Sequence, residues 1–113
     1  MSPAPYFNRD GSPCGDVLEW AREFETSDRH VGLTQVTDRA RSIRVSTVFL
    51  GLDHGFGSGP PLIFETMTFP DDDLLEEDCE RYATEDQAHA GHAAMVAKVA
   101  ATMDNPLIQE VER

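Results

Sequence analysis

Apolar and polar residues alternate most clearly in the middle of the chain. In residues 43–50 one set of alternate positions is apolar or threonine, and the other set becomes apolar toward the end, as in a central strand buried on both faces. Residues 30–37 are β-branched at several positions and reach this strand through a polar break at 38–41, which predicts a hairpin. Alternation resumes in residues 62–69. These patterns predict a three-stranded antiparallel meander.

Helical signals lie on both sides of this meander. Asp16, with Glu19 three positions later, forms a capping box, and apolar residues follow at the helical period to about residue 25. Thr84, with Gln87 three positions later, predicts the start of a second, longer helix that ends near residue 105. Five residues of this second helix fall on one face and should pack on the sheet: Ala88, His92, Met95, Val99 and Met103.

These elements predict an α+β fold in which a small three-stranded antiparallel sheet packs against an N-terminal helix and a longer C-terminal helix. A length of 113 residues suits one domain with one small core. We expect residues 1–15 to form an irregular lead-in, residues 16–103 to form the domain, and residues 104–113 to form a frayed tail.

The charge of the chain excludes some partners. The formal net charge is −12, so a basic surface for direct binding of nucleic acid or of an anionic membrane is not expected. Seven of the 21 acidic residues fall within residues 71–80. Such a run most often forms a solvated connection, but it would also suit a basic partner. The candidate acidic surface consists of Asp71, Asp72, Asp73, Glu76, Glu77 and Asp78.

Targeting signals and cysteines bear on the compartment. The first residues do not show a basic stretch followed by an apolar one, and no apolar run is long enough to cross a bilayer, so we expect a cytoplasmic protein without membrane contact. Cys14 and Cys79 are well separated in the sequence, which favours two reduced thiols over a zinc site. We predict no cofactor and no metal.

The glycine-rich segment 51–61 is the strongest candidate for a binding loop. Its four glycines permit close approach of the backbone to a ligand, and long structured loops in compact domains often carry function. The segment lacks the lysine of a P-loop and does not fit the dinucleotide fingerprint. The helix start near Thr84 could also attract an anion, although Thr84 already caps it. The candidate binding residues are Asp53, His54, Phe56, Gly57, Gly59, Tyr82 and Thr84.

An alternative is a catalytic site built from His54, His92, Asp53 and Glu65. Imidazoles and carboxylates together could support metal-assisted or histidine-assisted hydrolysis of a phosphodiester or nucleotide, provided that His54 and His92 converge. The structural interpretation of His92 is stronger. A single histidine on the apolar face of a helix usually donates to a backbone carbonyl across the core, and the spacing of a helical zinc motif is missing.

Several motifs together resemble a known family. The chain reads S-T-V-F-L-G-L-D-H at 46–54, G-P-P-L-I-F-E-T-M at 59–67 and R-Y-A-T at 81–84, followed by Gly91-His92. These motifs resemble those of a family of small, largely uncharacterised bacteriophage and prophage proteins. The chain departs from the family at Phe49, where tryptophan is common, and in the acidic segment. The resemblance implies a phage accessory protein and brings no activity with it.

We therefore expect a non-catalytic binder that acts in the cytoplasm of the infected cell as an antagonist of a host or anti-phage defence component. Its partner would be a host protein or a small anionic ligand. The alternatives are the hydrolase described above and a virion or assembly component, for which a homodimer through an exposed sheet face would be the expected sign.

Overall fold

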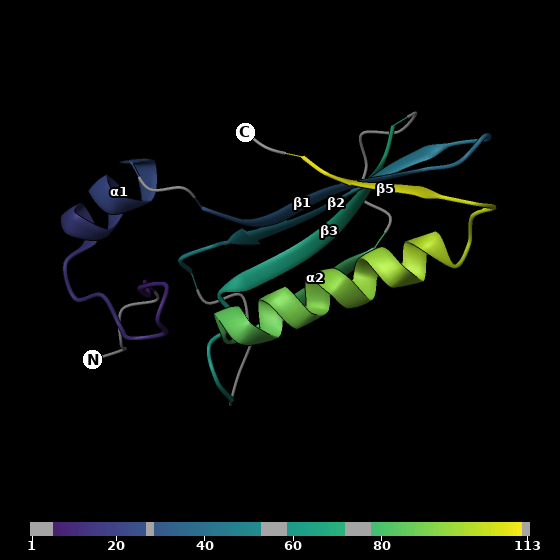
Figure 1. Cartoon of the computed structure of the whole chain (residues 1–113). Coiled ribbons are helices and arrows are strands. Elements are labelled where there is room, and N and C mark those ends of the chain that lie inside the picture. Colours follow the sequence, from purple (N-terminus) through teal and green to yellow (C-terminus); the bar gives the residue numbers. More distant parts are fainter. Residues whose placement is uncertain (1–5, 27–28, 53–58, 72–77, 112–113) are drawn as a thin grey trace.

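The computed structural model describes residues 6–26, 29–52, 59–71 and 78–111. They form one five-stranded antiparallel sheet with the strand order β4–β3–β2–β1–β5. Helix α2 lies along one face of this sheet (Figure 1). The elements are α1 (Val17–Thr26), β1 (His30–Thr37), β2 (Ser42–Phe49), β3 (Phe64–Pro70), β4 (Cys79–Tyr82), α2 (Glu85–Ala100) and β5 (Leu107–Glu110).

The expected fold, a three-stranded sheet packed against an N-terminal and a longer C-terminal helix, is wrong. Strands β1, β2 and β3 form the predicted meander, but β4 extends it beyond β3 and β5 extends it beyond β1. Strand β5 comes from the segment expected to be a frayed tail. Helix α1 lies beyond the end of the sheet rather than on its face (Figure 1), and its Val17 and Leu18 are exposed. Of the two described helices, α2 alone covers the sheet.

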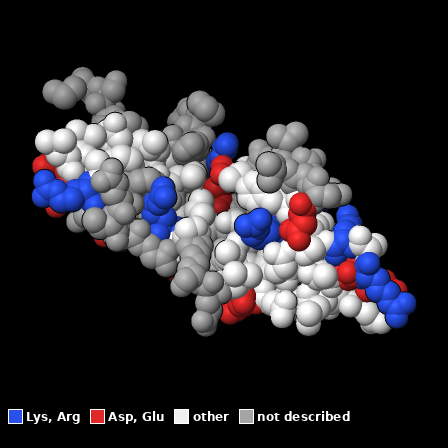
Figure 2. All heavy atoms as spheres, turned by 90° about the horizontal axis from the view of Figure 1, so that it is seen from above, with Lys and Arg blue, Asp and Glu red and all other residues white. Residues whose placement is uncertain are grey.

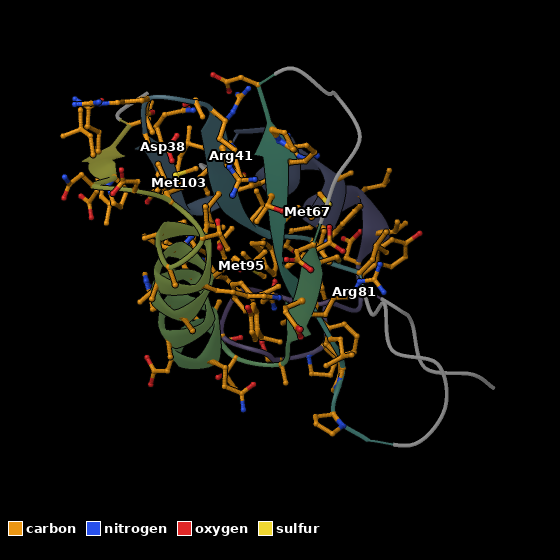
Figure 3. All side chains as sticks on the ribbon, turned by 90° about the vertical axis from the view of Figure 1, so that its right-hand side faces the viewer. Asp38, Arg41, Met67, Arg81, Met95 and Met103 are labelled. Carbon is orange, nitrogen blue, oxygen red and sulfur yellow. The ribbon has the colours of Figure 1, made fainter. Side chains whose placement is uncertain are left out.

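The core lies between α2 and the strand face that turns toward it. Because side chains alternate along a strand, this face receives Val36, Ile43 and Val45, which pack against Met95 and Val99 of α2. A second cluster of Ile63, Phe64 and Ala88 lies nearer the start of α2. Met95 points from α2 toward the sheet, whereas Met67 and Arg81 lie on its other face (Figure 3). The predicted apolar face of α2 is confirmed at Ala88, Met95 and Val99.

Both ends of α2 are held by local hydrogen bonds. Thr84 is the N-cap as predicted, and its hydroxyl accepts a hydrogen bond from the Gln87 backbone N–H at 3.1 Å. At the other end the helix stops at Ala100, earlier than expected, and a turn leads to Asn105, which has a positive φ of 50°. This turn brings the chain back along β1 as β5.

Gly91 allows β4 and α2 to approach closely. A Cβ atom at Gly91 would lie 2.1 Å from the ring of Tyr82, which is shorter than any real carbon–carbon contact. Tyr82 also packs against the cluster of Ile63, Phe64 and Ala88. The missing side chain at Gly91 is therefore the reason that the Tyr82 ring can lie against the helix.

The substitution Gly91→Ala tests this packing. Alanine is the better helix former by about 1 kcal/mol, but here the Tyr82 ring must swing away, and we expect overpacking to cost about 1–3 kcal/mol. Urea denaturation should therefore show a net loss of stability. In a Tyr82→Ala background the same change should stabilise the protein, because the propensity gain remains and the clash is gone. A stabilising Gly91→Ala in the native background would contradict the packing described here.

Candidate functional site

A groove of about 280 Å³ runs between β4 and α2, and we call it the β4–α2 groove. It exists because Gly91 and Ala94 give this side of α2 very little side-chain bulk. Tyr82 and Met95 supply apolar surface, and polar groups stand near the rim. The lining residues are Glu80, Tyr82, Gly91, Ala94, Met95 and Lys98. A concave surface with apolar lining and a few polar groups is the usual form of a binding site.

The acidic segment ends beside this groove. Asp78 immediately precedes β4, and its backbone is fixed by hydrogen bonds with Thr68 at 2.9 and 3.1 Å. Its carboxylate Oδ2 lies 3.1 Å from Lys98 Nζ on α2. Of the six predicted acidic-surface residues, Asp71 and Asp78 are described, and Asp72, Asp73, Glu76 and Glu77 lie outside the described residues.

One face of the described surface carries side chains of both charges. Figure 2, seen from above the view of Figure 1, shows Lys and Arg side chains beside Asp and Glu side chains, with uncharged surface between them. The pair Arg9–Glu85 is one such contact. The excess of negative charge therefore belongs largely to the acidic segment, as its seven acids in residues 71–80 indicate.

His92 forms the centre of a polar network under α2. Its Nδ1 lies 2.7 Å from Thr47 Oγ1 on β2, and its Nε2 lies 2.8 Å from Thr34 Oγ1 on β1. Thr47 Oγ1 in turn lies 2.6 Å from Thr66 Oγ1 on β3. All three threonines are buried. A neutral imidazole offers one donor and one acceptor, and hydroxyl groups can serve as either, so every ring nitrogen is satisfied.

The environment of His92 favours its neutral form. Burial lowers the pKa of His92, the nearby charge of His89 lowers it further, and the carboxylate of Glu110 acts in the opposite direction. Gly32 on β1 faces the ring, and a Cβ atom there would lie 3.0 Å from it. His92 is thus a half-buried structural residue packed between α2 and the sheet, and its partners are threonine hydroxyls rather than the predicted backbone carbonyl.

Glu65 does not join His92. It follows Phe64 and precedes Thr66, so alternation places its side chain on the sheet face away from α2. There it is buried, and its Oε2 accepts a hydrogen bond from Arg81 Nε at 2.8 Å and one from the Cys79 thiol at 3.5 Å. His92 and Glu65, the two described members of the hydrolase site, therefore lie on opposite faces of the sheet. Asp53 and His54 lie outside the described residues.

The remaining candidate binding residues have separate positions. Phe56 and Gly57 lie outside the described residues, and Gly59 is exposed with a φ of +121° and open space beside it. The hydroxyl of Thr84 is used by the helix cap. Tyr82 is the one described member of this set that lines the β4–α2 groove.

Metal-binding clusters, disulfides and membrane-spanning helices are absent among the described residues. No group of three or more histidine, cysteine or acidic side chains among them could hold a metal ion. Cys14 is buried and Cys79 is exposed on β4, and no disulfide joins these two described residues. No helix in the described part of the chain has the length and apolar character needed to cross a membrane.

Two features were not predicted from the sequence: the threonines around His92 and the α2 side of the groove. Thr34, Thr47 and Thr66 occupy inward positions on three neighbouring strands, and that shared placement facing a helical histidine is the signal that could have revealed the network. Ala94 and Lys98 follow Gly91 at helical spacing, so they could have been assigned to one side of α2 together.

The His92 network predicts how stability depends on pH. Because the folded protein holds His92 with a pKa below the ordinary value of 6.5, the unfolded chain binds this proton more readily. The stabilising contribution is fully present above pH 6.5 and is lost as the pH falls through the lowered pKa. The melting temperature of the protein should decrease as the pH is lowered below 6.5. His92→Gln should remove part of this dependence of melting temperature on pH. The exposed His89 provides the control: burial is the main cause of the lowered pKa of His92 and the charge of His89 is the smallest, so His89→Gln should retain most of the slope. Equal slopes for the native protein and His92→Gln would contradict this account.

Comparisons of the chain with protein-family models, with curated proteins and with solved structures found no match. Two features of the chain itself bear on its function. One is the β4–α2 groove with the end of the acidic segment beside it. The other is the His92 network, which fixes α2 over the sheet.

Proposed function

We propose that this protein is a non-catalytic binder that receives its partner in the β4–α2 groove. The observation that carries the proposal is the groove itself, which has apolar surface from Tyr82 and Met95 and acidic groups at Glu80 and the adjacent Asp78. Apolar surface supplies binding free energy by leaving water, and the carboxylates select the charge of the partner.

Binding suits this groove better than catalysis does. An acid–base catalyst needs a titratable group within reach of its substrate. Lys98 is paired with Asp78, and both ring nitrogens of His92 are held by buried threonines. Glu65 is engaged with Arg81 on the other face. Lys98, His92 and Glu65 thus each serve the fold or an ion pair.

The chemistry of the groove favours a protein partner with an apolar or aromatic side chain next to a basic group. The acidic segment beside the groove would attract such a surface and increase the rate of encounter. A small anionic ligand fits less well, because Asp78 and Glu80 would repel it. Binding to a basic partner should weaken as salt rises.

The biological setting is a further part of the proposal. Tyr82 belongs to the R-Y-A-T motif and Gly91 to the Gly-His pair, both of which resemble motifs of small phage and prophage proteins. Gly91 and Tyr82 are also the pair that shapes the groove. This agreement supports a phage accessory protein that antagonises a host or anti-phage defence component.

The substitution Ala94→Trp tests the groove. An indole at position 94 should fill the groove and prevent partner binding, because Ala94 lines it. The matched control is Ala93→Trp, since residue 93 is exposed and lies about 100° further round the helix. The measurement is quantitative mass spectrometry of bacterial proteins retained by each immobilised variant. We expect proteins held by the native chain and by Ala93→Trp to be lost with Ala94→Trp.

A salt series on the same captures tests the charge of the partner. Raising the salt from about 0.05 to about 0.5 M should release the retained protein, and Asp78→Asn with Glu80→Gln should weaken its retention at low salt. Equal retention by the native chain and Ala94→Trp would overturn the groove as the binding site.

A further inference from the structure

We infer that β5 is a self-association strand: two copies of this chain join their β5 edges in antiparallel pairing and form one continuous sheet. The β5 edge, defined here as residues 107–111, is the end of the sheet opposite β4. This inference goes beyond the proposed function, because the β4–α2 groove lies at the other edge of the sheet and stays open in such a dimer.

The backbone of β5 has hydrogen-bonding groups that point outward. Val111 N–H donates to Leu33 O at 2.8 Å, and pairing continues through Gln35 with Gln109 and Thr37 with Leu107. In an antiparallel ladder the intervening residues direct their N–H and C=O groups to the opposite side. These residues are Ile108 and Glu110, and within the described part of the chain no strand lies beyond them.

The side chains of the β5 edge protect it only at Glu110, the one charged residue among 107–111. Edge strands usually carry charges, proline or a bulge that prevents pairing with another chain. Here Leu107, Ile108 and Val111 are exposed by 57%, 50% and 41%. Leu107 and Val111 lie on the sheet face away from α2. On that face Val111 is paired with Leu33 of β1. An open edge with apolar groups on both faces is suited to another strand.

The edge is already held in position. Arg41 Nη2 lies 2.6 Å from Thr102 Oγ1, and the Asp104 backbone N–H donates to the Asp38 carboxylate at 3.1 Å. Both contacts join the β1–β2 turn to the turn that precedes β5. Hydrogen bonds from backbone N–H groups, including that of Asp104, lower the pKa of Asp38 and so keep it charged. A preformed edge reduces the ordering cost of association.

The strand is complementary to itself in one register. Pairing Ile108 of one copy with Glu110 of the second copy satisfies all the outward N–H and C=O groups of both residues, and places Gln109 on the two-fold axis. Leu107 then lies opposite Val111 of the second copy. The two neighbouring registers are less favourable. With Ile108 on the two-fold axis, Glu110 would pair with Pro106, which has no N–H to donate. With Glu110 on the axis, the two Glu110 carboxylates would lie opposite each other.

This self-complementarity makes a second copy the occupant, and charge sets the strength of association. The interface is short, so the dimer is expected to be weak. Each copy carries a formal charge of −12, so the two copies repel each other at long range. Salt should screen this repulsion and strengthen the dimer, which is the reverse of its effect on the basic partner of the groove.

Sedimentation equilibrium of the full chain at protein concentrations up to about 1 mM tests the inference. We expect a species with twice the 12.5 kDa mass of one chain, more populated at about 0.5 M than at about 0.05 M salt. Leu107→Lys should raise the dissociation constant at least about tenfold. Leu18→Lys makes the same change at the exposed Leu18 of α1 and should leave the constant unchanged.

A paired substitution tests the register. Val111→Glu alone should also weaken the dimer, but combining it with Leu107→Lys should restore association, because each new lysine would face a new glutamate across the two-fold axis. Circular dichroism of each single variant should show the native fold, so that its loss of association is not a loss of folding. A monomer under all conditions, equal effects of Leu107→Lys and Leu18→Lys, or a double variant no better than the singles would overturn the inference. None of these results would affect groove binding as tested by Ala94→Trp.

Discussion

The hydrogen bonds of the His92 ring fix α2 over the middle of the sheet. The ring bridges Thr34 on β1 and Thr47 on β2, and Thr47 extends the contact to Thr66 on β3. Unpaired polar groups at these buried positions would be costly, so the network favours one placement of the helix over others that would bury similar apolar area. That placement brings Gly91 against Tyr82. The close contact between these two residues shapes the β4–α2 groove, which both of them line.

Sequence patterns predicted the central elements because those elements are half-buried or capped. Strands β2 and β3 alternate, and α2 has both an N-cap at Thr84 and a regular apolar face. Strand β5 could not be predicted in this way, since all four of its residues are exposed and leave no buried face to alternate. Strand β4 is hidden for a related reason: Glu80 and Arg81 continue the charged composition of the acidic segment. Its pairing depends on contacts with β3 that are remote in sequence.

The candidate site was predictable only in part. Tyr82 was singled out and lines the groove, whereas Thr84 caps α2. The separation of Glu65 from His92 follows from strand geometry, because Glu65 is next to Thr66 and must point to the other face. Threonine is common in strands of every kind, so Thr47 gave no sign of its histidine partner. Tertiary structure, rather than residue type, turns these side chains into a network that holds the helix.

The central claim is that His92 is a structural bridge with both ring nitrogens engaged. Long-range nitrogen–proton NMR of the histidine side chains tests it most directly, because it distinguishes the two neutral tautomers and follows their protonation. With either tautomer, both ring nitrogens can be paired with threonine hydroxyls, so His92 should be neutral at neutral pH, with a pKa below the ordinary value of 6.5. A pKa at or above that value would contradict it.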